Sequence, residues 1–161
     1  MSSGTSIRVG ADIVKVVQVS DSIASFGERY LRRIYTEHEI ASCAGPPSVT
    51  SAGLAARFAA KEATLKVLRP SGHRPDWRSM EVLRHPEGWC SMSLSGHAAE
   101  LATRAGIGEL AVSLTHEEGI AAAVVVALCN DEEVPGQPRK THERELASNG
   151  VGSWTRKFVA F

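Results

Sequence analysis

The chain has 161 residues, with 18 lysines and arginines, 18 aspartates and glutamates, and 43% hydrophobic residues. This length is typical of one domain, and it buries enough surface to fold without a disulfide or a structural metal. No apolar run reaches the roughly 20 residues that span a membrane, and the first residues lack the pattern of a secretory signal. The zero net charge argues against nucleic-acid binding through bulk charge. Three widely spaced cysteines fit a reduced compartment. We therefore expect a cytoplasmic protein that binds neither nucleic acid nor membranes.

The first predicted element is a strand over residues 6–17. Its alternation indicates that one face is buried, the face of Ile7, Val9, Ala11 and Ile13. Asp12 falls on the other parity, beside Gly10. Aspartate is disfavoured in strands, and a glycine within a strand often marks close approach of a ligand to the backbone. The alternative for Asp12 is a solvent-facing residue of an edge strand.

Three helices are predicted next. Apolar residues at helical spacing indicate a first helix over residues 20–35. Thr36 and Glu39 form a capping box, so a short second helix begins there and ends at residues 45–47. The strongest helical pattern covers residues 51–68, with an apolar stripe of Leu54, Phe58, Leu65 and Leu68.

The second half of the chain is predicted to be mostly strand. Residues 79–85 and 89–95 read as a hairpin, and residues 97–105 as a short helix that Gly106 closes. Strands over residues 109–115 and 120–129 follow, the latter so apolar that it fits a central strand covered on both faces. We predict an α+β fold, a mostly antiparallel sheet packed by a long central helix and shorter helices. Residues 1–129 form the domain, and the polar residues 130–161 a flexible tail.

The long helix carries the most informative side chains. Glu62 and Lys66 are four residues apart and project from one face; the simplest interpretation is an exposed ion pair worth about 0.2–0.5 kcal/mol. Lys61 falls within the apolar stripe, where an unpaired ammonium is costly. It therefore either extends outward to solvent or borders a polar cleft.

Two carboxylates and a histidine complete the candidate set. An aspartate on a strand and a glutamate on a packed helix, Asp12 and Glu62, could share a divalent cation such as Mg²⁺. His116 ends a predicted strand at a turn, where ligand-binding residues are common. A local capping role is the alternative for this histidine.

Three motifs stand in order along the chain: GxD at residues 10–12, FxxKEA at residues 58–63 with Lys66 three residues further on, and SxxH at residues 113–116. This pattern closely resembles the 4′-phosphopantetheinyl transferases of the short holo-acyl-carrier-protein synthase type. The resemblance covers roughly residues 6–129, and it implies the fold of that family. It implies transfer of phosphopantetheine from coenzyme A to a serine of an apo acyl carrier protein, with release of adenosine 3′,5′-bisphosphate. The carrier could serve fatty acid, polyketide or peptide synthesis.

The resemblance also assigns roles to residues. Asp12 and Glu62 would bind Mg²⁺, with Mn²⁺ as an alternative, and together with Lys66 they would form the catalytic set. Coenzyme A would contact Arg57, Lys61, Lys66 and His116. Glu62 is the candidate general base, with Asp12 as the alternative.

The family resemblance further implies partners. The first helix would meet the acidic carrier protein through Arg29, Arg32 and Arg33. The family is usually homotrimeric with shared sites, so Asp12 and His116 would come from one chain, and Glu62 and Lys66 from the next. The alternative function is a non-catalytic module of the same fold that binds coenzyme A or a carrier protein.

Overall fold

The computed structural model describes residues 4–131, which form two antiparallel sheets and five α-helices. The elements in chain order are β1 (Gly4–Lys15), α1 (Val16–Phe26), α2 (Glu28–Ile34), α3 (Glu37–Ser42), α4 (Pro47–Leu68), the 3₁₀ helix η1 (Trp77–Ser79), β2 (Met80–Arg84), β3 (Cys90–Leu94), α5 (Gly96–Arg104), β4 (Ile107–Glu117) and β5 (Ile120–Asp131). The predicted α+β class is confirmed. Most of the predicted tail, from residue 132 onward, lies outside the described residues.

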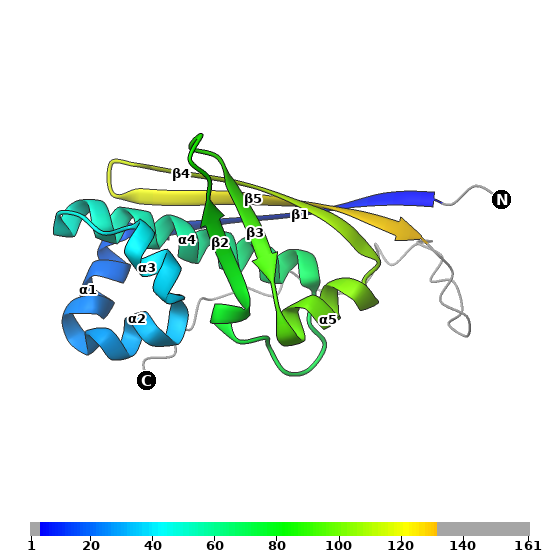
Figure 1. Ribbon diagram of the computed structural model, residues 1–161, viewed down its shortest axis with the longest axis horizontal. Coiled ribbons are helices and arrows are strands. Elements are labelled where there is room, and N and C mark those ends of the chain that lie inside the picture. The colour runs from blue at the N-terminus through cyan, green and yellow to red at the C-terminus, as the bar shows by residue number, and fades with distance from the viewer. Residues whose placement is uncertain (1–3, 132–161) are drawn as a thin grey trace, which may run out of the picture.

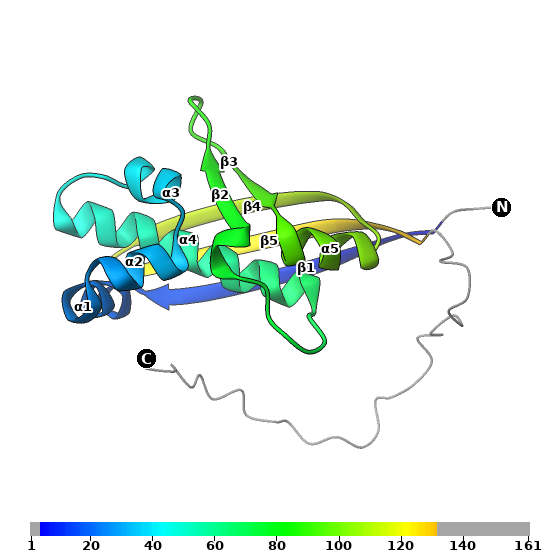
Figure 2. The ribbon, with the colours of Figure 1, turned by 60° about the horizontal axis from the view of Figure 1, so that its bottom comes forward.

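The main sheet has the strand order β1-β5-β4, so the apolar strand β5 is central, as predicted. The long helix α4 runs along one face of this sheet (Figure 1). The β2–β3 hairpin crosses α4, and its tip projects away from the sheet in both views (Figure 2). No helix within residues 4–131 combines the length and apolar character that a membrane span requires.

Helix α4 lies unusually close to β1, and Gly10 is the reason. A Cβ atom at this position would stand 2.1 Å from the carbonyl oxygen of Ala63, far inside contact distance. The glycine therefore allows the backbone of α4 to approach β1. Its place in a strand suggested the close approach of a ligand instead. On the same face of β1, Arg8 donates a hydrogen bond of 3.2 Å to the carbonyl of Val67, near the C-terminal end of α4.

The face of β1 that packs on α4 is the opposite of the one predicted. Ile7, Val9 and Ile13 are 64%, 61% and 56% exposed, whereas Gly10 and Val14 are buried. The apolar residues of this strand thus lie on the outer face of the sheet, next to exposed apolar residues of β5. In a single chain, β5 is likewise covered on one face and not on both.

Several helix boundaries differ from the prediction, and α1 begins at Val16, four residues earlier than expected. The helix expected over residues 20–35 is broken into α1 and α2 at Gly27, whose φ of 54° suits glycine. Helix α4 begins at Pro47, four residues earlier than expected, because proline is well tolerated at the first helical position. The capping box at Thr36 is present as predicted.

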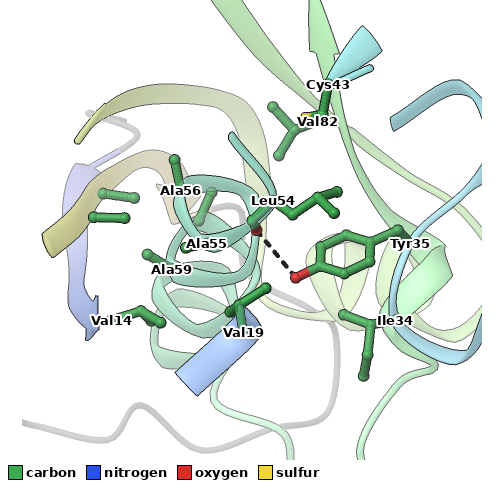
Figure 3. Packing of buried hydrophobic residues seen from close by; sticks show 13 residues of the cluster. Val14, Val19, Ile34, Tyr35, Cys43, Leu54, Ala55, Ala56, Ala59 and Val82 are labelled. Atoms are coloured by element: carbon green, nitrogen blue, oxygen red, sulfur yellow. Dashed lines mark hydrogen bonds between the residues drawn. The ribbon is translucent and has the colours of Figure 1, made fainter. Parts of the chain in front are cut away.

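The core lies between α4 and the elements around it (Figure 3). Small side chains of α4 (Ala55, Ala56 and Ala59) bring its backbone near Val14 of β1 and Val19 of α1. Tyr35, at the C-terminal end of α2, is buried against the helix and donates a hydrogen bond of 3.1 Å to the carbonyl of Leu54. The helix is therefore enclosed by the sheet on one side and by α1–α3 and the hairpin on the others.

Candidate functional site

Asp12 and Lys66 come together where α4 crosses β1. The Lys66 ammonium lies 3.0 Å from Asp12 Oδ1, and it also donates to the carbonyl of Ala11. The Asp12 side chain is only 10% exposed, whereas that of Lys66 is 50% exposed. Strand β1 thus holds a carboxylate at the edge of the protein interior, beside a lysine that reaches into solvent.

Glu62 lies one helical turn before Lys66, on the same face of α4. Its side chain is half-buried and makes an interaction of its own. Asp12, Glu62 and Lys66 therefore belong to one surface of a single chain. This contradicts the expectation that Asp12 comes from one subunit and Lys66 from the next, because the ion pair joins them within the chain.

His116 is not part of this group in the single chain. It lies exposed near the end of β4, which continues to Glu117, and it pairs in register with Ala121. Strand β5 separates β4 from β1, so His116 and Asp12 are at least about 10 Å apart by strand spacing alone.

Lys61 does not face the site. Its ammonium is fully buried and lies 2.9 Å from Glu39 Oε2, with further hydrogen bonds to the carbonyls of Trp77 and Met80. Burial lowers the pKa of Lys61, and the Glu39 carboxylate opposes this shift. Both sequence interpretations, an outward-facing lysine and a polar cleft, are wrong, because a buried carboxylate is the partner. The expected contact of Lys61 with coenzyme A is not available in this conformation.

Glu39 is the residue that sequence reasoning missed. The sequence indicates it only as the N3 residue of the capping box that begins at Thr36. The structure buries it completely, where it accepts from the backbone of Thr36 and Val82 and from Lys61. A lysine inside an apolar stripe was the available signal, because such a lysine requires an acidic partner.

Arg57 is also largely buried, on the face of α4 toward α3. Its guanidinium donates to the carbonyl of Gly53 at 3.2 Å and to Ser42 Oγ at 2.9 Å, and its Nε has no partner among the described atoms. Burial raises the pKa of the neighbouring Cys43 thiol, and the Arg57 charge opposes this shift. Arg57 is thus separate from the group around Asp12.

The three predicted docking arginines lie on α2, beyond the break at Gly27, and not on the first helix. All three are exposed. Arg32 pairs with Glu28 at 3.1 Å, and the Arg29 guanidinium lies 5.8 Å from the centre of the Phe26 ring. They form a basic surface, although part of its charge is offset by Glu28.

The family model of the 4′-phosphopantetheinyl transferase superfamily matches residues 8–129. The chain belongs to this superfamily. Among relatives of this superfamily, a holo-[acyl-carrier-protein] synthase of Chloroflexus aurantiacus is 40% identical over 133 residues, covering 73% of this chain and 95% of the relative. The synthase of Dehalococcoides mccartyi strain CBDB1 is 40% identical over 122 residues, covering 75% and 98%.

Solved structures agree with this membership. The crystal structure of the Helicobacter pylori holo-[acyl-carrier-protein] synthase in complex with coenzyme A matches with a TM-score of 0.65 and 28% identity. The match covers 74% of this chain and 99% of that one. The three motifs quoted above all lie within the matched region of the superfamily, so the family resemblance is confirmed.

Proposed function

We propose that the chain transfers the 4′-phosphopantetheine group from coenzyme A to a serine hydroxyl of an apo acyl carrier protein. The observation that carries this proposal is the joining of Asp12 to Lys66 on the same surface as Glu62, in a chain of this superfamily. The serine oxygen forms a new bond to the phosphorus that carries pantetheine. The bond from that phosphorus to the bridging pyrophosphate oxygen breaks, and adenosine 3′,5′-bisphosphate leaves.

The donor set fits a magnesium ion. Asp12 and Glu62 offer hard carboxylate oxygens, and Mg²⁺ usually takes one or two protein carboxylates and leaves its other positions to water and phosphate. Within residues 4–131 no three acidic, histidine or cysteine side chains cluster, which suits this shared coordination better than an all-protein site. When bound, Mg²⁺ or Mn²⁺ would neutralise charge on the pyrophosphate oxygens.

Each side chain of the group then has a chemical task. Lys66 has an ammonium that is half-exposed and can turn from Asp12 to a phosphate oxygen, where it stabilises the charge that develops during transfer. Glu62 is the general base that takes the proton of the serine hydroxyl, and Asp12 is the alternative. The burial of Asp12 holds its carboxylate in a fixed position against α4.

A homotrimer with shared sites is part of the proposal. The outer face of the main sheet is apolar and exposed over β1 and β5, at Ile7, Val9, Ile13, Val124 and Leu128. An exposed apolar surface of this kind is typical of a subunit interface. In such an assembly Asp12, Glu62 and Lys66 come from one chain, and His116 of a neighbouring chain contacts the nucleotide part of coenzyme A.

Transfer is tested by the intact mass of a purified apo acyl carrier protein after incubation with the chain, coenzyme A and Mg²⁺. We expect a gain of one phosphopantetheine group that EDTA abolishes. The Glu62→Gln variant should lose most of its turnover with little change in affinity for coenzyme A, whereas Glu37→Gln, at an exposed position of α3, should behave as wild type. Binding of coenzyme A without transfer to any carrier would instead support the non-catalytic module. Equal losses of turnover and affinity in Glu62→Gln would contradict the role of Glu62 as a base.

A further inference from the structure

The buried ion pair of Glu39 and Lys61 has no part in the proposed chemistry, yet it is built with unusual completeness. Both side chains are 0% exposed, and Nζ and Oε2 are 2.9 Å apart. The lysine uses all three of its donors, toward Glu39 and the carbonyls of Trp77 and Met80. Glu39 accepts in addition from the backbone of Val82 at 3.0 Å. The pair thus joins α4 to α3, to η1 and to β2.

Stability alone is a weak reason for such a pair. Removing two charges from water is expensive, and well-packed apolar residues of similar size often stabilise a core as much or more. What the pair adds is a fixed orientation of α4 relative to α3, η1 and β2, because hydrogen bonds fix angles that apolar contacts leave adjustable. The pair therefore restricts the movement of α4 relative to these neighbours.

The position of Lys61 around the axis of α4 shows which movement is restricted. Successive helical residues are about 100° apart, so Ala63, which contacts Gly10 of β1, lies about 200° around the axis from Lys61, roughly on the opposite side. Glu62 and Lys66 lie at about 100° and 140° from Lys61, in the arc between these two contacts. The helix is thus held at β1 on one side and at the buried pair on the other, with the proposed catalytic side chains between them.

We propose that the Glu39–Lys61 pair is a positioning device, which sets the rotation of α4 and thereby the aim of Glu62 and Lys66 toward Asp12. At a radius of about 5–6 Å, a rotation of about 10° moves a side chain by about 1 Å. A displacement of that size costs up to about 100-fold in rate. This inference rests on the proposed function for its catalytic readout.

The test is a double-mutant cycle between Lys61→Met and Lys66→Met in the full chain. We expect Lys61→Met to lower kcat by about 10- to 100-fold after correction for the folded fraction, with a smaller effect on the KM for coenzyme A. In the Lys66→Met background the same change should cost clearly less, because one of its two targets, the Lys66 ammonium, is already gone. Multiplicative losses in the cycle, or a loss equal to the unfolded fraction, would overturn the proposal.

Two further variants guard against simple unfolding. Glu39→Gln/Lys61→Met removes both charges and leaves no lone buried ion; it should fold and still show the loss of kcat. Leu101→Ala, which opens the cluster that packs α5 against Leu65, Leu68 and Met80, is the control that destabilises the chain while keeping both charged members of the pair. Its kcat should be unchanged once the folded fraction is counted. A doubly neutral variant with full kcat would refute a positioning role.

A readout that does not depend on transfer separates this proposal from the proposed function. Mn²⁺ binding in the presence of coenzyme A, measured by electron paramagnetic resonance, should weaken by about 10-fold or more in Lys61→Met, as for other residues that orient metal ligands. Leu101→Ala should bind as wild type. If the wild-type chain binds Mn²⁺ but transfers nothing, the proposed function fails and the positioning role stands on this measurement. Unchanged Mn²⁺ binding in Lys61→Met would overturn it.

Discussion

Gly10→Ala should be among the most damaging single-methyl changes in this chain. The new Cβ would stand 2.1 Å from the carbonyl oxygen of Ala63, 3.0 Å from its carbonyl carbon and 3.1 Å from Cγ2 of Val67. Ordinary contact begins at 3.4 Å, so the oxygen is about 1.3 Å too close. Two of these atoms belong to the backbone of a buried helix and have no rotamer through which to escape. The helix and the strand must therefore separate.

The expected loss follows from this shortfall. Overpacking of a core typically costs about 1–3 kcal/mol, and a clash with backbone lies at the upper end, so we expect about 3 kcal/mol in the free energy of unfolding. For a domain of this size that corresponds to a fall of about 10 °C in Tm. Urea unfolding followed by circular dichroism measures the first quantity and a thermal scan the second. Separation of α4 from β1 should also lengthen the Asp12–Lys66 contact and lower the transfer rate of the molecules that remain folded.

Gly45→Ala is the matched control. Its Cβ would meet Cγ1 of Val49 at 3.6 Å, an ordinary contact at an exposed position. This variant should lie within about 0.5 kcal/mol of wild type. If Gly10→Ala proved as stable as Gly45→Ala, the close approach of α4 to β1 would be refuted, together with the argument that this approach builds the site.

Three other changes test separate parts of the molecule. Burial raises the pKa of Tyr35 well above its ordinary value of 10.0, so the unfolded chain loses this proton first. The free energy of unfolding therefore falls as the pH rises above 10.0, by up to about 1.4 kcal/mol per pH unit. Urea titrations of Tyr35→Phe should show a shallower fall with pH, and an equal slope would reject the assignment. If the chain forms the proposed trimer, Val9→Lys should reduce the mass found by light scattering to that of a monomer, while Val49→Lys, similarly exposed but on α4, should leave it unchanged. Arg29→Glu should raise the KM for the carrier protein several-fold and leave the KM for coenzyme A unchanged. Arg104→Glu, at an exposed position of α5, is the control and should change neither constant. Equal effects of Arg29→Glu on both constants would argue against docking at α2.

The order and type of the elements could be predicted because local patterns determine them. Short-range periodicity and turn residues predict the capping box at Thr36, the hairpin of β2 and β3, and the strands β4 and β5. Boundaries were less predictable. Gly27 sits within a continuous apolar stripe, and only its positive φ reveals that the chain turns there into a second helix.

Which face of β1 is buried could not be predicted from the strand alone. The pattern of Ile7, Val9 and Ile13 indicates an apolar face correctly, but burial in the core and burial against another subunit give the same alternation. The inner face instead carries Arg8, Gly10 and Asp12, which look like a surface in sequence. Each of them has a specific partner or contact on α4 or near it, which only the tertiary arrangement supplies.

The same arrangement explains why the motifs mix small residues with charged ones. In GxD, Gly10 removes the atom that would keep α4 away, and two residues later on the same face Asp12 receives Lys66 at 3.0 Å. On the helix, Ala63 provides the surface that meets Gly10, next to Glu62. A larger residue at position 10 would clash with the Ala63 backbone, and a larger one at position 63 would press on the buried residues of β5; either would move the lysine from the aspartate without changing a charged group. The small residues of the two motifs therefore set the distance across which the charged ones act.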